Sequence, residues 1–185
     1  FDKAIPDFDK AVELQPDYVA AYINRGDAYN GLGQFDKAIP DFDKAIELQP
    51  DEAIAYNGRG YAYDQSGQYE TAIADFDKAI QLQPDYAEPY DNRGTTYSRL
   101  GQYDKAIPDF DKAVELLPTS PEIFSHRGTA YGNLGMYDLA IADYEKVLQL
   151  QPTAIEAYIS LGYLYGEVEQ YDKAFANLDK AIELQ

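Results

Sequence analysis

The chain has 185 residues, with 33 acidic side chains against 15 basic ones and a formal net charge of −18. This excess of negative charge disfavours nucleic acid and anionic membrane surfaces as partners, because both are themselves polyanions. The absence of cysteine excludes disulfides, thiolate nucleophiles and cysteine-ligated zinc.

Self-alignment at a spacing of 34 residues shows a strict repeat, because it brings five glycines into one column without an insertion. The column consists of Gly26, Gly60, Gly94, Gly128 and Gly162. The same register places an aromatic residue four positions before and another three positions after each glycine. Spacings of three and four residues gather these side chains on one helical face, so each unit should open with a helix.

The predicted units follow one another along the chain. Residues 1–18 match only the second half of a unit and its exit turn. We expect full units at 19–52, 53–86, 87–120, 121–154 and 155–185, forming one continuous domain.

Each unit should contain two packed helices. In the first full unit, Ala38, Phe42 and Ala45 present a small, a large and a small side chain on one face of the second helix. The column glycine of the first helix lets that face approach closely. A turn through Gly33 should join the two helices, and Pro50 should end the second, because a proline ring cannot continue the hydrogen-bond ladder.

This pattern resembles the tetratricopeptide repeat. A unit of that family has an aromatic, a small or leucine position, glycine and tyrosine on helix A, then alanine, an aromatic and alanine on helix B, and a closing proline. The resemblance covers essentially the whole chain. It implies an all-α fold, namely a right-handed α-solenoid of antiparallel helix hairpins.

An arginine stands beside the column glycine, where the family usually has leucine. A partly buried guanidinium needs a counter-charge, since an unpaired buried cation is strongly unfavourable. An aspartate follows each arginine by sixteen residues, whereas the last unit has Leu161 and Asn177 in these two places. We therefore predict a structural ladder, with a row of arginines that binds ligand phosphates or carboxylates as the alternative. The predicted pairs are Arg25 with Asp41, Arg59 with Asp75, Arg93 with Asp109 and Arg127 with Asp143.

The resemblance also implies a partner-binding groove lined by helix A. Carried over residue by residue, the groove residues are Ile23, Asp27, Asn30, Asn57, Tyr61, Asp64, Asp91, Thr95, Ser98, Arg99, Ser125, Thr129, Asn133, Ile159 and Tyr163. These side chains are mostly polar, acidic or tyrosine, while all ten lysines fall on helix B segments. We expect an electronegative groove that binds a basic or polar protein or peptide segment. The alternative is that the acidic residues only keep the repeats soluble.

Other chemistry has little support in the sequence. Chaperone-binding members of the family hold a terminal carboxylate with lysine, arginine and asparagine, but here the corresponding positions are Ile23, Asn57, Asp91 and Asp27. His126 is the only histidine, so neither a metal triad nor a serine triad can be assembled. The aspartates of the repeated "DFDK" should form ordinary surface pairs with lysines such as Lys37 and Lys44. We expect no cofactor, no metal and no enzymatic activity.

Two functional readings remain. The first is a protein-interaction scaffold. The second is a structural protein that assembles end to end, because the chain opens on a bare helix B and closes at "AIELQ" without a polar capping helix. This second reading implies homo-oligomers through the solenoid ends.

The sequence leaves the cellular compartment open. No apolar run approaches the length of a membrane span, so we expect no membrane insertion and a soluble protein. A cysteine-free chain suits reducing and oxidising compartments alike; the cytoplasm is slightly favoured, and an extracellular or periplasmic location is not excluded. Phe1 follows no initiator methionine or signal pattern, which suggests a fragment or a processed product.

Overall fold

The computed structural model describes residues 2–184, and this part of the chain forms eleven α-helices and no strand. The all-α helical-repeat prediction is therefore confirmed. The helices group into two compact units, one ending at Thr96 and the other beginning at Tyr97. In chain order the helices are α1 (Ile5–Leu14), α2 (Val19–Gly31), α3 (Phe35–Leu48), α4 (Ala53–Gln65), α5 (Tyr69–Leu82), α6 (Ala87–Arg99), α7 (Tyr103–Leu116), α8 (Pro121–Asn133), α9 (Tyr137–Leu150), α10 (Ile155–Glu167) and α11 (Tyr171–Glu183).

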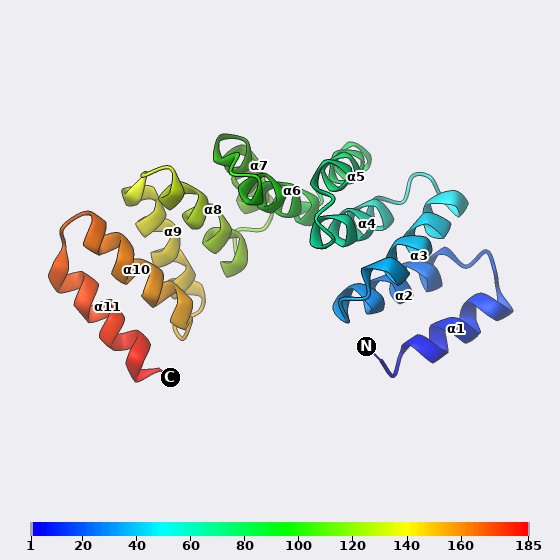
Figure 1. Cartoon of the computed structure of the whole chain (residues 1–185), viewed down its shortest axis with the longest axis horizontal. Helices are drawn as coiled ribbons and strands as arrows, with labels where there is room; N and C mark the ends of the chain where they lie inside the picture. The colour runs from blue at the N-terminus through cyan, green and yellow to red at the C-terminus, as the bar shows by residue number, and fades with distance from the viewer. Residues whose placement is uncertain (1, 185) are drawn as a thin grey trace. The chain divides into compact units, whose positions relative to one another are not determined.

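Antiparallel hairpins make up each unit, as Figure 1 shows. In the first unit, α2 packs on α3 and α4 on α5, while α3 also packs on α4 and α1 on α2. In the second unit, the pairs α8 with α9 and α10 with α11 are joined by contacts of α7 with α8 and of α9 with α10. Each of α2, α4, α8 and α10 thus packs against the helix that follows it and the helix that precedes it.

The hairpin turns depend on a left-handed residue after helix A. The backbone φ is 69° at Gly33 and 78° at Gly67, and the N–H of Gln34 donates to the carbonyl of Tyr29 at 2.9 Å. In the last hairpin Glu169 takes this place with a φ of 59°. A residue with a Cβ adopts this conformation at a cost of about 1 kcal/mol, so the last turn is less favourable than the glycine turns.

Phenylalanine rings of helix B fill notches left by glycines of helix A. Phe42 is fully buried, and its ring lies against both Gly26 and Gly58. A Cβ at Gly26 would stand 2.8 Å from the ring, and one at Gly58 would stand 2.5 Å from it. The ring therefore occupies the space that two missing side chains leave, and it joins α2, α3 and α4 into one core.

Candidate functional site

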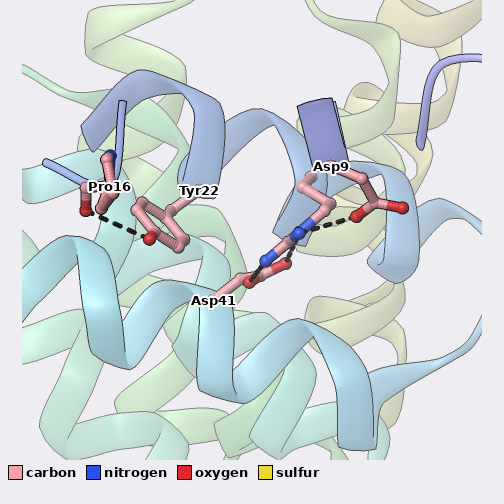
Figure 2. Close-up of polar contacts among 5 residues, drawn as sticks. Asp9, Pro16, Tyr22 and Asp41 are labelled. Carbon is pink, nitrogen blue, oxygen red and sulfur yellow. Dashed lines mark hydrogen bonds and ion pairs between the residues drawn. The ribbon is translucent and has the colours of Figure 1, made fainter. Parts of the chain in front are cut away.

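Arg25 of α2 lies between two helices B and bonds to an aspartate on each. Its Nε and Nη2 donate to the two carboxylate oxygens of Asp41 at 2.8 and 2.5 Å, and its Nη1 donates to Asp9 Oδ1 at 2.7 Å. Figure 2 shows this arrangement, in which Tyr22 also donates its hydroxyl to the carbonyl of Pro16 at 3.1 Å. The guanidinium thus joins α2 to α3 within its own hairpin and to α1 of the preceding half repeat.

The same arrangement recurs with the same spacing in both units. Arg59 donates from Nε and Nη2 to Asp75 at 2.8 and 2.7 Å, and from Nη1 to Asp43 at 2.6 Å. Arg127 donates to Asp143 at 2.9 and 2.7 Å and to Asp111 at 2.7 Å. These are the partners expected from the sixteen-residue spacing, together with a second aspartate sixteen residues before each arginine.

The fourth arginine, Arg93, donates from Nη1 to Asp77. Its expected partner Asp109 belongs to the other unit, so that pair stays a prediction.

The second set of aspartates corrects one expectation from the sequence. Asp43 bonds to Arg59 of the next hairpin rather than to a lysine, whereas Lys44 donates to Glu47 and Lys37 to Gln34. The interaction was missed because it joins successive repeats. A signal was present, since Asp9, Asp43, Asp77 and Asp111 each precede an arginine by sixteen residues.

These arginines are occupied by contacts within the protein. The hydrogen bonds that Arg59 donates to Asp75, and also to Asp43, raise the pKa of its guanidinium above the ordinary value. Arg59 also lies 5.6 Å from the ring centre of Tyr56, and Arg127 lies 5.7 Å from that of Tyr131. The paired arginines therefore stabilise the stacking of hairpins. This role argues against the alternative that they bind the phosphates or carboxylates of a ligand.

The expected groove residues differ in exposure, and two of them are corrected. Ile23 is only 8% exposed and packs in the core with Phe42 and Ala55. Asp64 is 5% exposed and accepts a hydrogen bond from Thr96 Oγ1 at 2.9 Å. Neither residue lines an open surface, because each is buried in contacts between helices.

The remaining expected groove residues keep solvent access. The exposed ones are Asp27, Tyr61, Arg99, Thr129, Asn133 and Tyr163. The half-buried ones are Asn30, Asn57, Asp91, Thr95, Ser98, Ser125 and Ile159.

In the first unit these residues adjoin an acidic cluster around Tyr86. Asn57 Nδ2 donates to the Tyr86 hydroxyl at 3.2 Å, and Asn57 Oδ1 accepts from Asn92 Nδ2 at 2.9 Å. Burial, together with the negative charges of Glu88, Asp27 and Glu52, raises the pKa of Tyr86 to about 12. Although the Asp27 side chain is exposed, the surrounding protein partly desolvates its carboxylate and so raises its pKa above the ordinary value. Tyr86 and Asn92 were not anticipated from the sequence, because neither lies in the groove positions that the resemblance supplies.

In the second unit, three of the expected groove residues lie at a pocket of about 500 Å³. Thr129 and Asn133 of α8 line it together with Tyr163, Leu164 and Glu167 of α10. The remaining lining residues are Gly128, Gly132, Tyr137, Tyr144 and Ser160. Three of the expected groove residues, Thr129, Asn133 and Tyr163, are thus brought together at one cavity.

His126 does not belong to this surface cavity. Its ring lies 6.0 Å from the ring centre of Phe110, so it packs beside the core of the second unit. Among residues 2–184, no group of three His, Cys, Asp or Glu side chains could hold a metal ion. The helices within the same range are too short or too polar to cross a bilayer.

Sequence comparison assigns the architecture to a family. Models of the tetratricopeptide repeat match residues 8–39, 31–87, 60–130, 121–154 and 155–185. The solved structure of YrrB is 31% identical, and the match covers 96% of this chain and 92% of YrrB with a TM-score of 0.76. The chain belongs to the tetratricopeptide repeat family.

Other tetratricopeptide repeat structures have the same fold. A crystal structure of MamA protein is 28% identical with a TM-score of 0.78, and the match covers 90% of this chain and 91% of MamA. MamA 41-end from Desulfovibrio magneticus RS-1 is 21% identical with a TM-score of 0.81, covering 90% and 94% of the two chains. No curated protein sequence matches the chain.

Membership of the tetratricopeptide repeat family decides the class of function. Such proteins present stacked helix hairpins to other proteins and are non-enzymatic. This tetratricopeptide repeat protein is accordingly an interaction scaffold.

Proposed function

We propose that the tetratricopeptide repeat protein binds a basic or polar extended segment of another protein on its helix A surfaces. The acidic cluster around Tyr86 is the observation that carries this proposal. A cationic side chain placed near Asp27 and Glu88 would meet two carboxylates and an aromatic ring. The similar protein YrrB has an unusual peptide-binding site, which supports a peptide as the kind of partner.

The distribution of charge along the helices supports the same partner. No lysine lies on a helix A, and four of the five arginines stand beside a column glycine. Three of these four, Arg25, Arg59 and Arg127, each bond to two aspartates. The acids of helix A therefore attract cations without a matching set of surface lysines on the same helices.

The effect of Asp27 ionisation on the free energy of unfolding distinguishes a binding role for this residue from a structural one. The pKa of Asp27 is higher in the folded state than in the unfolded state. At pH values between these two pKa values the folded state binds more protons, so the free energy of unfolding falls as the pH rises through this range. Above this range the ionised carboxylate continues to lower stability. A residue that lowers stability and stays exposed on the groove side is suited to a partner rather than to the fold.

The test is a titration with an acetylated, amidated peptide of four Gly-Ser-Lys repeats, followed by calorimetry. We expect Asp27→Asn to weaken binding by about two- to fivefold, the value of one exposed charge pair. The same variant should be as stable at neutral pH as the unmodified protein, or more stable. Asp36→Asn, which changes an exposed carboxylate in the first turn of α3, is the matched control and should leave the affinity unchanged.

Two outcomes would refute the proposal. The first is equal affinity for the lysine peptide and for a matched peptide of Gly-Ser-Glu repeats. The second is an equal loss of affinity in Asp27→Asn and Asp36→Asn.

A second candidate function, self-assembly, is favoured by the apolar residues on α11. Phe175, Ile182 and Tyr171 are exposed on this helix at spacings of four and seven residues, which places them along one side. Light scattering over a concentration series tests it. A mass that rises with concentration would support assembly, and a constant monomer mass would refute it.

A further inference from the structure

The pocket between α8, α9 and α10 is lined in part by Gly132, at a position where another repeat has a side chain. In the first full repeat, Asn30 occupies the position of Gly132, and its Nδ2 donates to the carbonyl of Gly58 at 2.9 Å. A Cβ built on Gly132 would lie 3.5 Å from Leu164, which is an ordinary van der Waals contact. Packing does not require glycine at this position, and the glycine places no side chain in the adjoining space of about 500 Å³.

The lining of the pocket combines one carboxylate with aromatic and apolar surfaces. Glu167 is exposed at α10 and accepts a hydrogen bond from the Tyr137 hydroxyl at 3.3 Å. Tyr163 is 71% exposed, so its ring offers a flat surface to an incoming group. Leu164 supplies the apolar part, and the hydroxyls of Thr129 and Tyr144 are bonded to one another at 2.7 Å.

The protein already holds guanidinium groups with these same chemical groups. In the second unit, Arg127 is bonded to Asp143 and Asp111 and lies 5.7 Å from the ring centres of both Phe124 and Tyr131. A carboxylate bonded to a planar guanidinium, with an aromatic ring against its face, is thus a combination that this fold uses. The pocket offers a carboxylate and tyrosine rings with no arginine of the chain among its lining residues.

We propose that this pocket binds an arginine side chain of the partner segment. The guanidinium bonds to Glu167 and stacks on Tyr163, while the aliphatic stem packs against Leu164. The inference deepens the proposed function, on which it rests, by naming the residue that the second unit recognises. Glycine at position 132 keeps this part of the pocket free of a side chain.

The test uses the whole chain and the small probe acetyl-Gly-Arg-Gly-amide, with nitrogen-15 NMR as the readout. We expect saturable shifts of the Thr129, Gly132 and Tyr163 amides. The citrulline probe, which keeps the shape and loses the charge, should bind about tenfold more weakly, because charge-assisted bonds are the stronger kind. Equal binding of the citrulline or the lysine counterpart, or shifts that do not saturate, would overturn the assignment.

Two variants with matched controls locate the probe. Gly132→Leu fills the pocket and should abolish binding, whereas Gly166→Leu adds the same side chain where a Cβ meets nothing within 4 Å and should have no effect. Glu167→Gln should weaken binding about tenfold without altering the core, and Glu156→Gln, on the same helix, should not. Unchanged binding in Glu167→Gln would refute the proposal even if Gly132→Leu failed to fold.

The failure of this inference can be told apart from failure of the proposed function. The lysine peptide and Asp27 test the first unit and general attraction of cations, while the arginine probe and Glu167 test only the pocket. If the lysine peptide binds but the arginine probe causes no shifts at the pocket, the arginine assignment alone is removed. If the arginine probe shifts the pocket amides but the lysine peptide does not bind, the wider proposal is removed and the assignment of arginine to the pocket remains.

Discussion

Replacing Phe42 with alanine should lower the free energy of unfolding by about 3–5 kcal/mol, the range for loss of a fully buried phenylalanine. The ring lies against Gly26 and Gly58, so its removal would open a cavity shared by α2, α3 and α4. Neither glycine has a side chain that could fill the space. Urea unfolding followed by far-ultraviolet circular dichroism measures the change.

Phe175→Ala is the matched control for this experiment. Phe175 is 65% exposed on α11, so its truncation should change stability by no more than about 0.5 kcal/mol. A loss of less than about 1 kcal/mol for Phe42→Ala would contradict the packing of phenylalanine into glycine notches.

Breaking the arginine pair between α4 and α5 should cost about 2–3 kcal/mol for either single change, Arg59→Leu or Asp75→Asn. Arg59→Leu leaves the buried Asp75 carboxylate without this partner, and Asp75→Asn leaves the partly buried guanidinium with Asp43 alone. This loss lies below the range of about 3–5 kcal/mol for a fully buried pair, because the Arg59 side chain is 20% exposed and also bonds to Asp43. The double variant should lose less than the sum of the two by about 1–2 kcal/mol.

The last repeat shows that the double change is compatible with the fold. It carries Leu161 and Asn177 at these positions, and Leu161 is buried in the core. Urea unfolding of the two single variants and the double variant gives the coupling energy. Strictly additive losses would contradict the pairing, whereas additive losses are the expected result for Arg59→Leu combined with Asp36→Asn, whose carboxylate lies about two turns of α3 before Asp43.

The sequence predicts what depends on local spacing and strict repetition. Gly26 and Phe42 could be assigned to facing helices because both recur at 34 residues with helical spacing around them. Asp41 could be assigned to Arg25 because the last repeat loses both charges together. Each of these inferences needs only the contacts within one hairpin.

Features that depend on how hairpins stack were less accessible. Asp43 bonds to an arginine of the next hairpin. The sequence favoured nearby lysines because spacing within one helix does not reveal the contacts between successive repeats. Ile23 and Asp64 were assigned to the groove by family position, but neighbouring helices bury them. The pocket beside Gly132 could not be predicted either, because it also depends on contacts between hairpins: its lining includes residues of α10 as well as of α8.

Amide mapping of the lysine peptide on nitrogen-15-labelled protein tests recognition by the helix A surfaces most directly. We expect the largest saturable shifts at Asp27, Tyr61 and their neighbours on α2 and α4, and none on the exposed sides of α3 and α5. Shifts concentrated on the helices B, or no saturable shift at all, would contradict an acidic recognition surface on the helices A.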